Sequence, residues 1–205
     1  MILNRRRIVR VKHIFLICAV VGCGKKEAES PTVEIADPIL EKAIRVKSQK
    51  PRNMELTERD LEYMTSLSFD DKKLTEVPKG LEKLTKLERL DLQYNQLTDM
   101  KGLENLTQLE RLNLNVNKLT KVKRLEKLTQ LEWLWLGGNQ LTDVKDLEKL
   151  TQLEVLYLGY NQLTDVMGLE KLTKLEHLWL YNNKLTDVKG LEKLTQLTEL
   201  ELSNN

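Results

Sequence analysis

The chain has 205 residues, with 33 basic and 31 acidic side chains and a net charge of +2 at pH 7. This balance, without a clustered basic face, argues against nucleic acid as a partner. Two cysteines and two histidines offer little for a disulfide framework or a metal site. The length suits one extended domain.

Residues 1–22 have the composition of a secretory signal peptide. Five basic residues and no acidic one precede Cys23, and residues 14–21 form an apolar run of eight. A helix that spans a bilayer needs about 20 apolar residues, whereas a basic start and a short apolar run are typical of an export signal. Without this segment the chain would carry 28 basic and 31 acidic residues, a net charge of −3.

The end of this signal resembles the bacterial lipobox, in which a small residue precedes a cysteine that becomes lipidated. The matching residues are Val20, Val21, Gly22 and Cys23, and Val20 stands where leucine is commoner. The resemblance implies lipidation of Cys23 and an exported lipoprotein, anchored to the membrane in the bacterial cell envelope or at its surface. A plain secretory signal or an uncleaved anchor is the alternative. Residues 23–34 are polar and predict a flexible tether.

Residues 35–79 predict a helical N-terminal cap followed by a degenerate first repeat. Asp37 and Pro38 are typical of the first positions of a helix, and Thr57 with Asp60 predicts the start of a second, short helix. The expected apolar stripe of the first helix is Ile39, Leu40, Ala43 and Ile44. The shortened repeat contributes the apolar residues Leu67, Phe69, Leu74 and Val77.

Residues 80–205 repeat every 22 residues, in five complete copies and one partial copy. The first copy is GLEKLTKLERLDLQYNQLTDMK, and it contains the pattern L-x-x-L-x-L-x-x-N-x-L that defines leucine-rich repeats. Leu90 and Leu92 are two residues apart, so both lie on one face of a short strand. Strands of successive copies are expected to pair in parallel, about 4.8 Å apart. No copy can bury its apolar face alone, so the copies must stack.

One asparagine recurs in every copy, at the point where the chain turns off the strand. An amide both donates and accepts hydrogen bonds, so a stacked column can satisfy the backbone of adjacent copies. The fixed spacing indicates a structural role. The column consists of Asn95, Asn117, Asn139, Asn161, Asn183 and Asn205.

This 22-residue form resembles the internalin type of leucine-rich repeat, which is shared with the phosphatase-regulatory-subunit type. The resemblance covers residues 80–205 and extends into the helical cap. It implies an α/β solenoid: a right-handed superhelix with a parallel concave sheet and an N-terminal helical cap. It also implies recognition of a protein. The framework residues carry the fold only, since binding specificity differs between members.

Aromatic residues concentrate at the positions beside the strand leucines, which should point to the concave surface. Seven of the nine aromatic residues after position 22 lie in these columns, six of them in three adjacent copies. An exposed aromatic cluster is typical of an interface hot spot. The predicted ligand-binding residues are Trp133, Trp135, Tyr157, Tyr160, His177, Trp179 and Tyr181, with Arg89 and Arg111 at one rim. The alternative is that the aromatic rings only stiffen the sheet.

The sequence predicts a lipid-anchored module that binds a protein or peptide and has no catalytic activity, no cofactor and no metal. No nucleophile elbow, phosphate loop or zinc motif is present. A calcium ladder of aspartates is interrupted by Lys121. Two other functions stay open: binding of carbohydrate or cell wall by the aromatic rings, and a scaffold that assembles through the C-terminal end, where the sequence shows no polar cap.

The lipid anchor can be tested at one residue. Cys23→Ser should block acylation and leave the unprocessed precursor, because the thiol is the group that is acylated. Mass spectrometry of the mature N-terminus measures both effects. An unmodified Cys23 in the natural protein, or cleavage at another bond, would refute the lipoprotein prediction.

Overall fold

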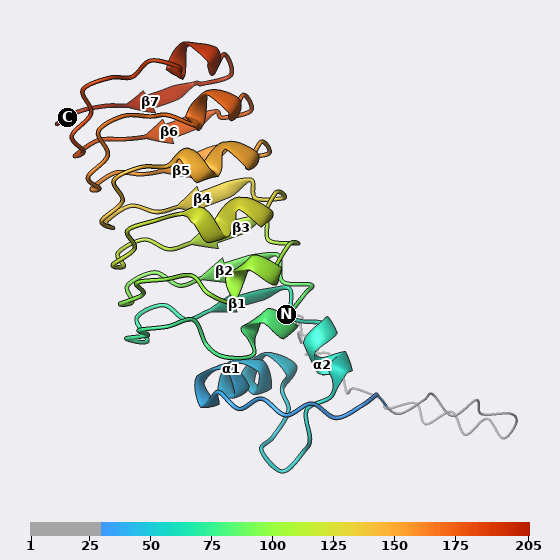
Figure 1. Ribbon diagram of the computed structural model, residues 1–205. Coiled ribbons are helices and arrows are strands. Elements are labelled where there is room, and N and C mark those ends of the chain that lie inside the picture. The colour runs from blue at the N-terminus through green and yellow to red at the C-terminus, as the bar shows by residue number, and fades with distance from the viewer. Residues whose placement is uncertain (1–29) are drawn as a thin grey trace, which may run out of the picture.

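In the computed structural model, which describes residues 30–205, seven parallel strands form one open sheet in chain order. The predicted signal peptide, Cys23 and the start of the tether lie outside the described residues. The strands are β1 (Ser66–Ser68), β2 (Arg89–Asp91), β3 (Arg111–Asn113), β4 (Trp133–Trp135), β5 (Val155–Tyr157), β6 (His177–Trp179) and β7 (Glu199–Glu201). The repeats are stacked from the helical end to β7 (Figure 1), and this architecture confirms the leucine-rich repeat solenoid.

A short 3₁₀ helix returns the chain after each strand from β1 to β6. These turns form a row beside the row of strands (Figure 1). Each places one leucine, such as Leu81 or Leu103, in the core. The 3₁₀ helices are η1 (Leu81–Lys83), η2 (Leu103–Asn105), η3 (Lys123–Lys127), η4 (Lys145–Lys149), η5 (Leu169–Lys171) and η6 (Leu191–Lys193).

The repeat period sets the register of the sheet. The central leucine of each strand lies opposite the central leucine of the next, as Leu112 does with Leu134 and Leu134 with Leu156. All three are fully buried. Because the register has no offset, the side chains on the other face of the strands also align in columns.

The asparagine column bonds the backbone of neighbouring repeats, as predicted. Asn117 Nδ2 donates to Leu92 O in the preceding repeat at 3.0 Å and to Leu114 O in its own repeat at 3.1 Å. Its Oδ1 accepts from the N–H of Leu97 at 3.0 Å. Asn139 repeats this arrangement one turn later with Leu114 O, Leu136 O and the N–H of Leu119. Each amide therefore satisfies buried backbone groups that the strand ladder does not reach.

Two helices, α1 (Pro38–Ser48) and α2 (Glu58–Glu62), precede the sheet. Asp37 Oδ1 accepts from the N–H groups of Ile39 and Leu40, at 2.9 and 3.0 Å, and so begins α1 as predicted. Leu40 and Ile44 are fully buried, but Ile39 is exposed. The predicted apolar stripe was wrong at Ile39, because this residue lies about 100° around the helix from Leu40.

The second helix begins at a capping box formed by Thr57 and Asp60. Asp60 Oδ2 accepts from the backbone N–H and the hydroxyl of Thr57, both at 2.7 Å, and from Lys50 Nζ at 2.5 Å. Burial would raise the pKa of Asp60, but the hydrogen bonds from Lys50 and Thr57 outweigh it and lower the pKa. The charged carboxylate therefore ties α2 to the end of α1. No helix within residues 30–205 has the length and apolar character to cross a membrane.

The last part of the predicted tether contacts the cap. Thr32 and Thr57 form an isolated antiparallel bridge. Val33 N–H donates to Leu56 O at 2.7 Å, and Glu58 N–H donates to Pro31 O at 2.9 Å. Residues 30–34 thus differ from the flexible segment expected, because their backbone forms hydrogen bonds with residues 56–58. The degenerate first repeat supplies β1, which pairs with β2.

The stacked arrangement predicts unequal costs for the same substitution. Leu134 is fully buried in the centre of the sheet, whereas Leu200, the equivalent residue of β7, is 43% exposed. Leu134→Ala should lower the free energy of unfolding by about 2–5 kcal/mol, and Leu200→Ala by less than about 1 kcal/mol. Urea denaturation of both variants measures the difference. Equal losses would contradict nearest-neighbour stacking.

Candidate functional site

Most predicted site residues flank the central leucine of a strand. These outward side chains, together with Tyr160 and Tyr181, are here called the sheet face. Trp133 and Trp135 flank Leu134 in β4, and His177 and Trp179 flank Leu178 in β6. Within the sheet, Trp135, Tyr157 and Trp179 occupy equivalent positions of β4, β5 and β6. Arg89 and Arg111 likewise occupy equivalent positions of β2 and β3. Tyr160 and Tyr181 follow β5 and β6.

The first set of contacts, here called the tryptophan group, contains Arg111, Trp133 and Trp135. The rings of Trp133 and Trp135 meet edge to face, with centroids 5.6 Å apart and planes at 62°. The guanidinium carbon of Arg111 lies 4.2 Å from the centroid of the Trp133 ring. This distance is within the range of a cation–π interaction. Both tryptophans remain partly exposed.

The second set, here called the tyrosine group, contains Tyr157, Tyr160, His177, Trp179 and Tyr181. The Tyr181 ring lies 5.8 Å from Tyr157 and 5.2 Å from Tyr160, both edge to face. The hydroxyls of Tyr157 and Tyr181 share a hydrogen bond of 2.5 Å. Burial, reinforced by this bond, raises the pKa of Tyr157, so the phenol stays protonated at neutral pH. The His177 ring stacks on Trp179 with planes at 7°.

Glu199 holds the far end of the tyrosine group, a contact that the sequence did not reveal. Trp179 Nε1 donates to Glu199 Oε1 at 2.8 Å, and His177 Nδ1 lies 3.2 Å from Glu199 Oε2. Sequence analysis could place Glu199 only in the same column as His177. One carboxylate therefore fixes two rings that it contacts from the next strand.

Two glycines make room for the tyrosine rings. A Cβ at Gly137 would lie 1.9 Å from Tyr157 Cε1, and a Cβ at Gly159 would lie 3.1 Å from Tyr181 Cζ. Each ring therefore covers the glycine of the preceding repeat. The sequence signal was present, because both glycines replace the side chains that other copies have at this position, but sequence analysis did not assign them a role.

Tyr160 and the residues at the equivalent position of other repeats lie in a turn rather than on a strand. Tyr94, Val116, Tyr160 and Asn182 have φ angles between 53° and 57°. Valine is rare in this left-handed region because its branched side chain crowds the backbone. Tyr160 is 57% exposed, and its ring contacts that of Tyr181.

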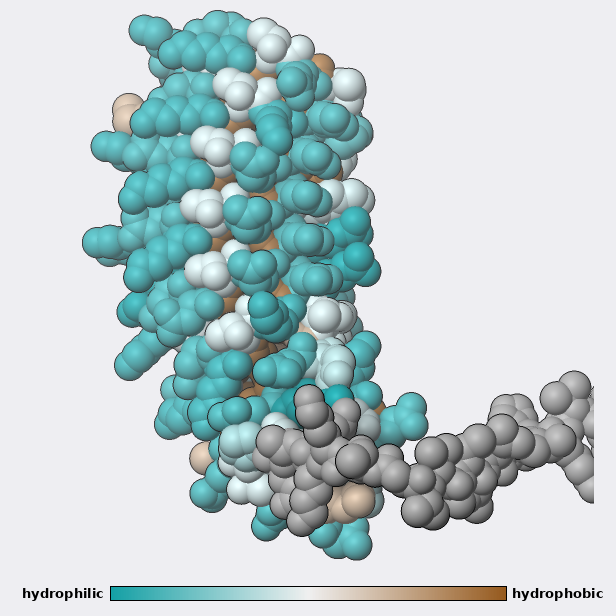
Figure 2. All heavy atoms as spheres, turned by 90° about the vertical axis from the view of Figure 1, so that its right-hand side faces the viewer, coloured by the Kyte–Doolittle hydropathy of each residue, from teal (hydrophilic) through white to brown (hydrophobic). Residues whose placement is uncertain are grey.

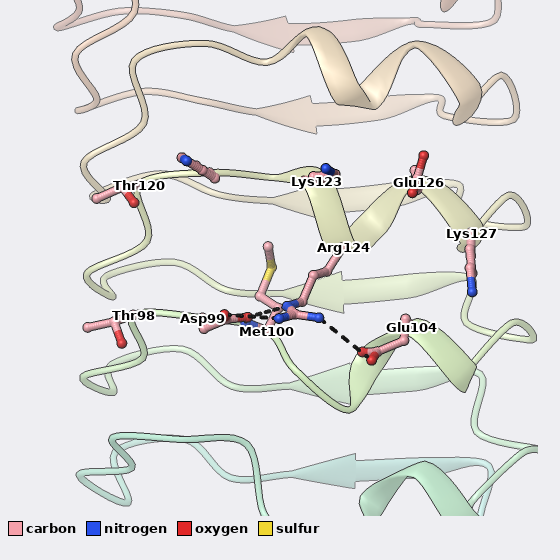
Figure 3. A pocket seen from close by; sticks show the side chains of 10 residues that line it. Thr98, Asp99, Met100, Glu104, Thr120, Lys123, Arg124, Glu126 and Lys127 are labelled. Carbon is pink, nitrogen blue, oxygen red and sulfur yellow. Dashed lines mark hydrogen bonds and ion pairs between the residues drawn. The ribbon is translucent and has the colours of Figure 1, made fainter.

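A separate hollow of about 620 Å³ lies among η2, η3 and the turns before them, away from the sheet face. Arg124 points across it toward the preceding repeat (Figure 3), where Nε lies 2.5 Å from Asp99 Oδ1 and Nη1 lies 3.8 Å from Glu104 Oε1. These charges are paired with each other, which indicates a structural link between repeats. Among residues 30–205, no three His, Cys, Asp or Glu side chains are placed to hold a metal ion.

The surface in Figure 2 is mainly polar. Hydrophilic side chains cover the repeats, and apolar side chains show only as narrow strips between them. This view therefore shows no broad apolar patch.

A family profile described as leucine-rich repeats in two copies matches residues 85–127, 129–172 and 173–205. Among solved structures, internalin C2 of Listeria monocytogenes is 31% identical with a TM-score of 0.67, and the alignment covers 85% of this chain and 88% of that chain. Internalin F of the same species is 28% identical with a TM-score of 0.56, with 83% and 64% covered.

A leucine-rich repeat protein of Leptospira interrogans is 35% identical with a TM-score of 0.67, with 72% of this chain and 40% of that chain covered. A comparison with curated protein sequences found no match.

The glycine contacts predict that a single methyl group disturbs the tyrosine group. Gly137→Ala should displace the Tyr157 ring and weaken its hydrogen bond to Tyr181, because the new Cβ would overlap the ring. Near-ultraviolet circular dichroism should change, and the free energy of unfolding should fall by about 1 kcal/mol. Gly159→Ala is the matched control and should change both less. A spectrum identical to that of the natural protein in Gly137→Ala would contradict the proposed packing.

Proposed function

Because the chain belongs to the leucine-rich repeat family and is of the internalin type, we propose that it binds a protein or peptide ligand through its sheet face. The proposed contact residues are the tryptophan group, the tyrosine group and Arg89. Leucine-rich repeat stacks suit this role because their framework is constant while the outward columns vary.

The observation that carries the proposal is the arrangement of the rings on one face. Six partly or largely exposed aromatic side chains lie on three adjacent repeats, and hydrogen bonds and ring contacts hold most of them. Fixed Trp and Tyr side chains lose little conformational entropy when a ligand binds. Such residues, together with arginine, are the commonest energetic centres of protein interfaces.

The proposal is recognition rather than catalysis. Polar groups at this end of the sheet face have protein partners: the Tyr157 hydroxyl bonds to that of Tyr181, and Trp179 Nε1 donates to the Glu199 carboxylate. No nucleophile is paired with a base among the residues proposed to contact the ligand. We favour a peptide over a glycan because the tyrosine rings meet edge to face and so do not present one flat stacking surface.

We also propose that the module is exported and attached to the membrane of a bacterial cell through a lipid on Cys23. The support is the order of basic, apolar and small residues in the first 23 positions. A lipid anchor on one end would leave the repeat stack free to meet ligands in the cell envelope or at its surface.

The sheet-face proposal predicts that two tryptophans carry binding energy without carrying the fold. A random octapeptide library on phage can be selected against the natural chain, and the selected peptides synthesised. Trp135→Ala with Trp179→Ala should weaken these peptides at least about 30-fold, equivalent to about 2 kcal/mol. The melting temperature should change little, because neither ring belongs to the leucine core.

Tyr63→Ala is the matched control, since this tyrosine is 65% exposed in the helical cap. It should leave peptide affinity unchanged. If the double variant melts at a lower temperature but retains every peptide, the rings only stiffen the sheet. A selection that yields no peptide, together with capture of glycans on an array, would favour the carbohydrate alternative.

A further inference from the structure

We infer that the ligand presents a carboxylate side chain to Arg89 and Arg111, beside the tryptophan group, and is therefore an acidic peptide segment. This inference rests on the proposed function and specifies the chemistry of the ligand. It follows from a hollow on the sheet face, from two arginines without an acidic partner, and from the distribution of charge along the strands.

The hollow lies over β1, β2 and β3 and has a volume of about 360 Å³. Arg89 and Arg111 lie directly opposite each other on β2 and β3, so both cations border it. Trp135 forms part of its wall next to Arg111. The hollow thus brings the two arginines, together with Asp91, beside the tryptophan group.

Neither arginine is neutralised within residues 30–205, where no ion pair is found for Arg89 or Arg111. Arg111 Nε is buried and has no hydrogen-bond partner. A ligand carboxylate would therefore meet the terminal nitrogens of the guanidinium, since the buried Nε is enclosed by protein. The cation–π contact with Trp133 meanwhile holds the guanidinium in place.

Two other polar side chains of the hollow, Asn113 and Asp91, already have hydrogen-bond partners. Asn113 Nδ2 donates to Gln93 Oε1 at 3.0 Å. Asp91 Oδ1 accepts from the N–H of Gln93 at 3.0 Å. Burial, with a smaller effect from the charge of Asp70, raises the pKa of Asp91. Arg89 and Arg111 are the cations among the residues that line this hollow.

A carboxylate is the complementary group, because a guanidinium can donate two parallel hydrogen bonds to its two oxygens. Acidic side chains at the opposite end of the sheet face would repel the ligand carboxylate and so disfavour a ligand bound in the reverse direction. Glu199 and Glu201 occupy β7, and hydrogen bonds from Ser203 lower the pKa of Glu201, so it is charged at neutral pH. The acidic residue of the ligand should thus lie over β2 and β3, away from β7.

The strand spacing also sets the distance to the next anchor. Arg111 in β3 and Trp179 in β6 are three strand spacings apart, or about 14 Å at about 4.8 Å per strand. An extended peptide covers this length in about four residues. The ligand should therefore carry Asp or Glu about four residues from an apolar residue that packs against Trp179 or Tyr181.

The random octapeptide selection tests this inference. Peptides selected by the natural chain should be enriched in Asp or Glu at that spacing from an apolar residue. Arg89→Gln with Arg111→Gln should weaken them at least about tenfold and should abolish the dependence of affinity on sodium chloride concentration. Arg111→Lys should give an intermediate loss, because lysine retains the charge but not the planar stack on Trp133.

Arg52→Gln with Lys86→Gln is the matched control, since it removes the same charge from exposed positions off the sheet face and should leave the affinity unchanged. Enriched peptides that lack acidic residues, or that bind the double glutamine variant equally well, would overturn the inference while leaving the proposed function intact. A selection in which the natural chain enriches no peptide, or a glycan array on which it captures only acidic glycans, would overturn both the inference and the proposed function.

Discussion

The structure depends on one constraint: a 22-residue repeat cannot bury its leucines alone and must present them to a neighbour with the same spacing. Leu112, Leu134 and Leu156 therefore stack without offset on adjacent strands, and all three are fully buried. The same register aligns every other position of the repeat. A column of asparagines then closes the turns, and columns on the sheet face bring together residues that are 22 positions apart in the sequence.

This constraint explains why most of the fold was predictable. The period fixed the number of strands in the repeats, their parallel order and the identity of the core, because each copy repeats the same pattern of burial. The cap was less predictable, since it occurs once. Ile39 had the spacing of an apolar stripe but is exposed, and residues 30–34 had a polar composition but pair with the cap through Thr32 and Val33.

The candidate site was predictable only as a set of columns. Register placed Trp135, Tyr157 and Trp179 side by side, but it could not show how the rings turn. The tyrosine rings can lie over Gly137 and Gly159 because these residues have no side chain. The orientation of Trp179 depends on its hydrogen bond to the Glu199 carboxylate. These are contacts between different columns, and a repeat pattern describes only contacts within one column.

The two ends of the sheet face differ in how completely their polar groups are satisfied. In the tyrosine group, the hydroxyls of Tyr157 and Tyr181 bind each other, and His177 and Trp179 contact the Glu199 carboxylate. In the tryptophan group, ring contacts fix Arg111 while its Nε has no partner. In the proposed complex, the aromatic rings would supply affinity, and the charges of Arg89 and Arg111 would determine which ligand binds and in which direction.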